Sequence, residues 1–504
     1  MRDGKQSLTH RTLSGIFWTA WGRVAQITLQ TIVLAVLARL LTPADFGVVS
    51  AALVVIGFST IVSQIGLGPA LVQRKELEQR HIDTAFVSSV ALGTLLGATV
   101  WIIAPFAAGF FHVPRIEPVL RVLAWSFVIQ GLGLVSESLL RREMRFKWLA
   151  NRDVITYAVG YGAVGIALAM LGWGVWALVV AQLCQVALRT VLLLAIHPPR
   201  LRRLGDWAAF KDLMYFGGGF TMAKLANYVA LHGDNLVVGR TLGVAALGFY
   251  GRAYQLMTAP AHAIGLVLDN VLFPAMAKVQ DDQRRLTLGY RRGVSLIALL
   301  VLPTSVIMLV VAPEIVHLLL GARWASTIAP FQVLAAGTLF RTSYKMSDSL
   351  ARSTGAVYRR AWRQAYYALL VLGGAWIGQH WGITGVAWGV LGAVTVNFLA
   401  MAQLSLSLTG MRWADFWGAH VPAALLTLAT CPAAWATTRM ARYWELPSLV
   451  TLVLVGVVAG ALALVAASRY PAVFLGEDGM WILDRMRGFL PARLSVRVRS
   501  TARA

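Results

Sequence analysis

Long apolar runs constrain this chain more than any other feature of its sequence. Stretches of about 20 residues with few charges recur along nearly its whole length, and each can cross a hydrocarbon layer roughly 30 Å thick. Only 13% of the residues are charged, whereas soluble proteins average about a quarter. A backbone inside lipid must satisfy its own hydrogen bonds, and a run of this length does so as an α-helix. The sequence therefore predicts an all-α, polytopic membrane protein.

The apolar runs divide the chain into about fourteen predicted membrane spans, at about 20 residues each. We place them at residues 13–40, 46–72, 83–111, 117–140, 153–171, 174–196, 213–239, 245–277, 291–320, 326–351, 361–379, 382–408, 415–438 and 447–468. The longest connection begins with Pro198 and Pro199, which cannot continue a helix. The predicted organisation is an N-terminus (1–12), a first six-helix lobe (13–197), a linker (198–212), a second six-helix lobe (213–409), two further spans (410–468) and a basic tail (469–504).

Two internal sequence matches support a division into two lobes. The motif SESLLR at residues 136–141, which closes the fourth predicted span, is matched by SDSLAR at 347–352, which closes the tenth. Four residues near the end of the first span recur with the same spacing near the end of the seventh: Arg39, Leu41, Ala44 and Gly47 are matched by Arg240, Leu242, Ala245 and Gly248. Apolar helices share a narrow alphabet, so chance similarity is the alternative. An even number of spans separates the partners, which indicates a parallel repeat of two pseudo-symmetric lobes.

The charge distribution predicts the orientation of the chain. The formal net charge is +23, and the basic residues gather in clusters between alternate spans, as cytoplasmic loops do in membrane proteins. This pattern places both termini in the cytoplasm and argues against a nucleic-acid partner. No cleavable signal pattern is present at the N-terminus. Cys184 and Cys431 lie in separate apolar stretches, so neither a disulfide framework nor a metal-ligand spacing is expected.

Polar residues form stripes inside two of the predicted spans. Arg23, Gln26 and Gln30 share one face of the first helix, and Lys224 and Asn227 share a face of the seventh. Because lipid cannot satisfy such a stripe, it should face a protein interior or a water-filled cavity. The functional interpretation is a cationic cavity for an anionic substrate. The alternative for Arg23 is that its side chain extends to the cytoplasmic headgroups.

The tenth span carries a second polar stripe. Arg341, Lys345, Asp348 and Arg352 fall on one helix face, and Arg341 is the deepest of them. We expect Arg341 and Lys345 to contribute to the cationic cavity. Asp348–Arg352 and Glu137–Arg141 are i,i+4 pairs near the predicted cytoplasmic surface, and we expect structural or gating ion pairs there.

Two further carboxylates lie well inside predicted spans. Asp234 and Asp269 are candidate sites for coupling to H⁺ or Na⁺, or counter-ions of a neighbouring Lys or Arg. The sequence contains no phosphate-binding G-x-x-x-x-G-K-[ST] loop, no H-E-x-x-H and no G-x-S-x-G. We therefore predict no catalytic residues, no metal site, no cofactor and no enzymatic activity.

Several segments resemble the Wzx-type lipopolysaccharide and exopolysaccharide flippases, the polysaccharide branch of the multidrug/oligosaccharidyl-lipid/polysaccharide (MOP) exporter superfamily. They are residues 40–47 (LLTPADFG), 70–74 (ALVQR), 141–147 (RREMRFK), 234–240 (DNLVVGR) and 272–276 (LFPAM). The resemblance implies fourteen helices in the bacterial inner membrane and a substrate of sugars linked to undecaprenyl diphosphate. Such a flippase moves the lipid-linked unit from the cytoplasmic to the periplasmic leaflet by alternating access, for O-antigen, capsule or exopolysaccharide biosynthesis. Its partners would be membrane lipids and, in addition, polysaccharide polymerase and chain-length proteins.

Two other functions remain open at this point. A cation-coupled multidrug antiporter of MATE-like architecture has a related fold, but it should line its cavity with carboxylates, whereas the predicted cavity residues here are mostly cationic. An oligosaccharide polymerase or ligase is a third class.

Overall fold

The computed structural model describes residues 8–64, 67–74, 76–199, 206–267 and 276–487. Within those ranges, the description does not extend to the side chains of residues 8–17, 19–20, 61–64, 208, 212–226, 259–267, 482 and 485–487. Every element in the described part is helical, which confirms the predicted all-α class. Ten helical segments there are long and apolar enough to cross a membrane. The count of about fourteen spans stays a prediction.

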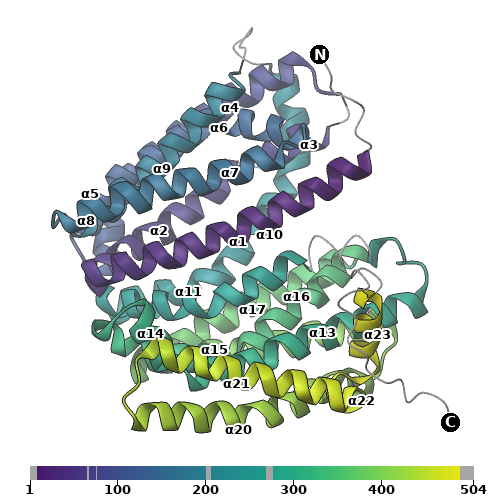
Figure 1. Ribbon diagram of the computed structural model, residues 1–504. Coiled ribbons are helices and arrows are strands. Elements are labelled where there is room, and N and C mark those ends of the chain that lie inside the picture. The colour runs from purple at the N-terminus through teal and green to yellow at the C-terminus, as the bar shows by residue number, and fades with distance from the viewer. Residues whose placement is uncertain (1–7, 65–66, 75, 200–205, 268–275, 488–504) are drawn as a thin grey trace. The chain divides into compact units, whose positions relative to one another are not determined.

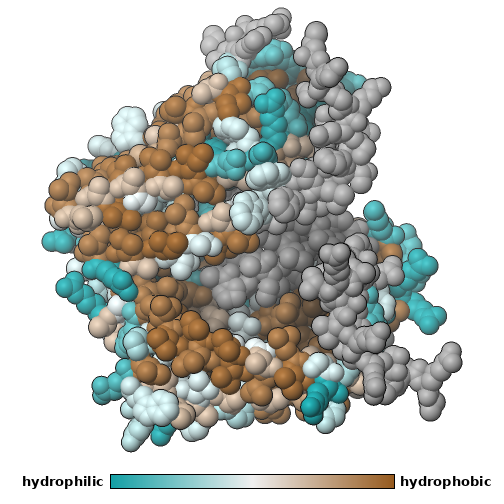
Figure 2. All heavy atoms as spheres, in the orientation of Figure 1, coloured by the Kyte–Doolittle hydropathy of each residue, from teal (hydrophilic) through white to brown (hydrophobic). Residues whose placement is uncertain are grey.

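Packing divides the chain into two compact units. The first comprises Met1–Ala253, Leu319–Thr327 and Gln364–Gly389, and the second comprises Tyr254–Leu318, Ile328–Arg363 and Val390–Ala504. The lobe and linker boundaries drawn from the sequence stay a prediction. Figure 2 shows that apolar side chains cover much of the described surface of the helices, as expected for helices in contact with lipid.

The first part of the chain forms long helices that pack along one another (Figure 1). Helix α6 packs against α4 and α9, and α1 packs against α7. A π-helical stretch, η1, joins α7 to α8. The elements are α1 (Leu8–Leu40), α2 (Pro43–Gln64), α3 (Leu67–Gln73), α4 (Gln79–Phe111), α5 (Ile116–Leu123), α6 (Trp125–Arg142), α7 (Phe146–Tyr157), η1 (Ala158–Gly165), α8 (Ile166–Met170), α9 (Val175–Ile196) and α10 (Trp207–Thr241).

The later part of the chain is equally helical. Helix α13 packs against α16 and α20, and α20 packs against α21. The elements are α11 (Val244–Val267), α13 (Gln283–Val310), α14 (Ala312–Leu319), η3 (Ala322–Thr327), α15 (Ile328–Ala336), α16 (Thr338–Ser353), α17 (Val357–Gly378), η4 (Gln379–Trp381), α18 (Gly382–Thr409), α19 (Trp413–Gly418), α20 (Val421–Tyr443), α21 (Ser448–Arg469), α22 (Pro471–Phe474) and α23 (Gly476–Arg487).

The two copies of the repeated motif meet inside the first unit. A Cβ atom on Gly47 would lie 1.7 Å from the carbonyl oxygen of Val244, and one on Gly248 would lie 1.9 Å from that of Pro43. No side chain fits at either position, so the starts of α2 and α11 are in backbone contact. The glycines that revealed the repeat in the sequence therefore form the contact between its two copies.

Candidate functional site

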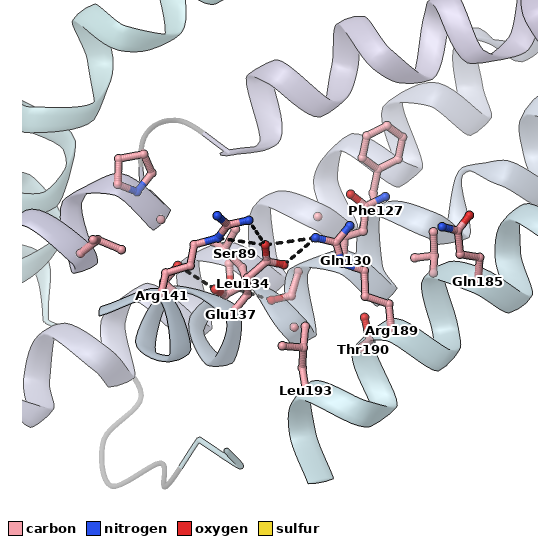
Figure 3. A pocket seen from close by; sticks show the side chains of 18 of the residues that line it. Ser89, Phe127, Gln130, Leu134, Glu137, Arg141, Gln185, Arg189, Thr190 and Leu193 are labelled. Carbon is pink, nitrogen blue, oxygen red and sulfur yellow. Dashed lines mark hydrogen bonds and ion pairs between the residues drawn. The ribbon is translucent and has the colours of Figure 1, made fainter. Parts of the chain in front are cut away.

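A cavity of about 710 Å³ lies within the first unit, between α3, α4, α6 and α9 (Figure 3). Helix α6 supplies the largest share of its wall. The lining is unusually polar for the interior of an apolar helical bundle. Its polar residues are Gln73, Ser89, Gln130, Glu137, Ser138, Arg141, Gln182, Gln185, Arg189 and Thr190.

Glycines hold the walls of this cavity in place. A Cβ atom on Gly131 would lie 2.6 Å from the carbonyl oxygen of Ser89, and one on Gly93 would lie 2.6 Å from that of Phe127. The backbones of α4 and α6 therefore touch on that side, as small residues allow between membrane helices. The hydroxyl of Ser89 also donates to the carbonyl oxygen of Gly131 at 2.9 Å, which fixes the register of the two helices.

Glu137 is the centre of the charge network in the cavity wall. Its carboxylate accepts hydrogen bonds from Arg141 at 2.7 Å and from Arg189 at 2.9 Å, and both contacts are drawn in Figure 3. Arg152 approaches the same carboxylate at 3.4 Å and pairs with Asp153 at 2.6 Å. Three guanidinium groups thus surround two carboxylates, and the network carries one net positive charge.

The sequence predicted part of this network. The structure places Glu137 and Arg141 in an ion pair, and their gating or structural role stays a prediction. Arg152 and Arg189 were not predicted as part of it, because they approach from α7 and α9. A signal was present for Arg189. Gln182 and Gln185 are three residues apart, and Arg189 follows Gln185 by four, so the three residues form a polar stripe along an apolar helix.

A similar cluster lies in the second unit. Asp348 pairs with Arg352 at 3.1 Å, as an i,i+4 pair of α16, and also with Arg360 of α17. Next to it, the buried hydroxyl groups of Ser347 and Tyr290 are 2.9 Å apart. In both units a carboxylate near the end of one helix therefore contacts an arginine from the following helix.

Arg341 is buried within the second unit, with 5% of its surface exposed. Its guanidinium donates to the hydroxyl of Tyr254 and lies 4.6 Å from the centre of that ring, in cation–π geometry. Lys345, one turn further along α16, is partly buried. The predicted contribution of Arg341 and Lys345 to a substrate cavity remains a prediction.

The stripe on the first helix is partly described. Arg23 donates to the side-chain oxygen of Gln26 at 3.4 Å, so the two residues share a face as expected. Gln30 is partly buried, and the side chain of Lys224 lies outside the described residues. Among the described residues, the lining of the 710 Å³ cavity includes Glu137 and Arg141 but none of the stripe residues Arg23, Gln26 and Gln30.

The remaining candidates lie on α10 or outside the description. Asn227 accepts a hydrogen bond from Gln364 at 3.2 Å, which joins α10 to α17. Asp234 is 1% exposed and accepts from the hydroxyl of Tyr250 at 2.8 Å. Asp269 lies outside the described residues. Within the described part of the chain, no group of His, Cys, Asp and Glu is arranged to hold a metal ion.

A helical membrane bundle with buried arginines and a polar, net-cationic cavity defines a membrane transporter. A family model described as "Polysaccharide biosynthesis protein" matches residues 36–329, more than half of the chain. The chain therefore belongs to this polysaccharide biosynthesis family, in agreement with the polysaccharide flippases that the sequence motifs resemble.

Named relatives agree with this assignment. The chain is 24% identical to the teichuronic acid biosynthesis protein TuaB of Bacillus subtilis. The match covers 90% of this chain and 95% of that protein. It is 26% identical to the lipopolysaccharide biosynthesis protein WzxC of Escherichia coli, over 67% of this chain and 68% of that protein. It is 23% identical to the succinoglycan biosynthesis transport protein ExoT of Rhizobium meliloti, over 82% of this chain and 88% of that protein.

Solved structures confirm the fold. The lipid II flippase MurJ in an inward closed conformation superposes with a TM-score of 0.70 at 12% identity, over 90% of this chain and 99% of that one. An inward-facing MATE family transporter of the MOP superfamily superposes with a TM-score of 0.61 at 17% identity, over 78% of this chain and 98% of that one. ExoT is named as a transport protein, MurJ as a flippase and the MATE protein as a transporter, which agrees with the prediction that the chain is not an enzyme.

Proposed function

We propose that the chain is a flippase for oligosaccharides linked to undecaprenyl diphosphate. It would move them from the cytoplasmic to the periplasmic leaflet of the bacterial inner membrane by alternating access, for the synthesis of a surface polysaccharide. Membership in the polysaccharide biosynthesis family and the relatives named for lipopolysaccharide, teichuronic acid and succinoglycan support this proposal. The fold shared with a lipid II flippase is consistent with it.

The observation that carries the proposal is the pairing of this family membership with cations buried in the helical bundle. A guanidinium is costly to bury in an apolar bundle, and Arg341 is one that this bundle keeps buried. Arginine is suited to a diphosphate or an acidic sugar because its planar group donates two parallel hydrogen bonds to such oxyanions. The same cations would repel the positively charged substrates of a multidrug antiporter.

The proposal includes the topology and the energy source. Both termini lie in the cytoplasm, since the basic clusters alternate with the spans. Coupling to H⁺ or Na⁺ would use Asp234 or Asp269, the carboxylates predicted inside spans. The polymerase and the chain-length protein that act on the flipped unit are the proposed partners, together with membrane lipids.

The test is complementation of a strain that lacks the gene. Arg341→Ala should abolish surface polysaccharide and cause lipid-linked repeat units to accumulate on the cytoplasmic side, while Arg341→Lys retains part of the export. Arg23→Ala should behave like Arg341→Ala if both cations face the substrate. Arg285→Ala is the matched control, because this side chain is 75% exposed. Each variant is compared at equal amounts of protein in the membrane.

Two results would contradict the proposal. If strains with Arg341→Ala and Arg23→Ala export normal amounts of surface polysaccharide, the cationic cavity has no role in transport. Restored resistance to cationic drugs, with surface polysaccharide unaffected by the deletion, would favour the antiporter instead.

A further inference from the structure

Two glutamine amides in the 710 Å³ cavity have no hydrogen-bond partner among the described residues. Gln130 comes from α6 and Gln185 from α9, and both line the cavity (Figure 3). Gln182, one turn from Gln185, differs, because it accepts a hydrogen bond from the hydroxyl of Tyr161 at 2.8 Å. Both side chains are partly exposed and line the cavity, so their amides are free to bind a polar occupant. Two such groups facing one cavity favour a polar occupant over an apolar one.

The arginines in the same wall have donors to spare. The side chains of Arg141 and Arg189 are 50% and 38% exposed, and each contacts the carboxylate of Glu137. A guanidinium has five N–H donors, and Glu137, together with Asp153 at 3.9 Å from Arg189, engages only some of them. Since the network has one net positive charge, an occupant with one negative charge would balance it.

The position of the cavity suits loading from the cytoplasmic side. Arg141 and Gln73 are exposed and lie at the ends of α6 and α3. Both helix ends lead into basic connections that the charge distribution assigns to the cytoplasm. The neutral amides of Gln130 and Gln185 lie further along their helices from this end.

We propose that this cavity binds the sugar part of the lipid-linked substrate, and that the sugar is acidic. The amides of Gln130 and Gln185 bind sugar hydroxyl groups, and Arg141 and Arg189 bind a carboxylate on the glycan. This assignment rests on the proposed flippase function and specifies its substrate class.

The chemistry of the wall disfavours other occupants. A polyprenyl or acyl chain would leave the amides of Gln130 and Gln185 without partners. A cationic drug would meet the guanidinium of Arg189. A diphosphate has the same oxyanion chemistry as a carboxylate, but it brings about two or more negative charges to a network with one net positive charge, at an energy cost that grows with burial.

The test measures binding to the purified full-length protein in lipid nanodiscs. The probes are a tetrasaccharide with one glucuronate and three N-acetylglucosamine units, the uncharged tetrasaccharide of N-acetylglucosamine, and inorganic pyrophosphate. We expect the acidic tetrasaccharide to bind at least tenfold more tightly than the neutral one. The double variant Gln130→Leu/Gln185→Leu should weaken its binding at least tenfold, which corresponds to about 1.4 kcal/mol.

A matched control separates this effect from a general loss of polarity. Gln403→Leu makes the same change at an exposed position of α18 and should leave binding unchanged. The double variant removes no hydrogen bond within the described chain, so it should remain monodisperse and melt at the temperature of the unmodified protein.

Three outcomes would overturn the assignment. The first is the absence of saccharide binding to the folded protein, and the second is equal binding of the acidic and neutral tetrasaccharides. The third is that pyrophosphate competes with the acidic tetrasaccharide for the unmodified protein but not for the double variant. Failure of the proposed function looks different: the protein would bind the acidic tetrasaccharide through Gln130 and Gln185, and a strain without the gene would still export polysaccharide.

Discussion

Replacement of Glu137 by glutamine should destabilise the first unit more than removal of any single exposed arginine around it. Glu137→Gln keeps the shape of the side chain but leaves Arg141, Arg152 and Arg189 without their common carboxylate. Arg152 is the most affected, because its side chain is 1% exposed; it keeps Asp153 at 2.6 Å, so the cost should fall at the lower end of the range for a buried pair. Removing one partner of a buried ion pair costs about 3–5 kcal/mol.

The matched change on the other side of the pair should cost much less. Arg141→Ala removes a side chain that is 50% exposed, and Glu137 keeps Arg152 and Arg189 as partners. An exposed pair of this kind contributes about 0–1 kcal/mol. The difference between the two variants is therefore expected to be at least about 2 kcal/mol.

The measurement is thermal unfolding of the purified protein in detergent, followed by the loss of the monodisperse peak in size-exclusion chromatography. At roughly 2–4 °C per kcal/mol, Glu137→Gln should lower Tm by at least about 6 °C, and Arg141→Ala by about 4 °C or less. Equal shifts for the two variants would show that Glu137 is not the centre of the network. A double variant, Glu137→Gln/Arg152→Met, should recover part of the loss, because it removes the buried charge as well.

Three further predictions concern packing and the second unit. Gly248→Val should sharply reduce the yield of folded protein, since its Cβ atom would lie 1.9 Å from a carbonyl oxygen, whereas Gly289→Val, which meets no atom within 4 Å, should give near-normal yield in the same fluorescence-detected chromatography. Asp348→Asn should lower Tm more than Arg352→Ala, because the carboxylate binds two arginines; the reverse order would contradict the similarity of the two clusters. Trp324→Phe should cost about 1–3 kcal/mol, since a buried carbonyl loses the indole N–H that donates to it at 2.9 Å, and an unchanged melting temperature would count against that bond.

Much of the fold follows from one-dimensional patterns in the sequence. The lengths of the apolar runs and the rule that lipid-exposed backbone must be helical predict the all-α class. The short connection at Gly172–Gly174 also follows, because α8 and α9 are joined there through two glycines with positive φ angles of 81° and 52°. Such features depend on neighbours in the chain, and a single sequence records them directly.

The candidate site depends instead on which helix faces meet, and a single sequence does not record this. The i,i+4 spacing was enough to pair Glu137 with Arg141, but Arg152 and Arg189 reach the same carboxylate from α7 and α9. The stripe of Gln182, Gln185 and Arg189 was visible, but no rule based on spacing alone places it opposite α6. Which helix faces pair becomes predictable when two positions are seen to change together among related sequences.

The internal repeat gives the cavity a further meaning. The match of SESLLR with SDSLAR aligns Glu137 with Asp348 and Arg141 with Arg352, and in the same register it aligns Gln130 with Arg341. The ion-pair cluster is therefore present in both units, as expected of a structural element that each bundle needs. The deeper position differs: it carries a neutral amide that lines the cavity in the first unit, and a buried guanidinium bound to Tyr254 in the second. Duplication followed by this one exchange would give one unit the chemistry for sugar hydroxyl groups and the other the chemistry for an oxyanion, and a sugar linked to a diphosphate lipid presents both.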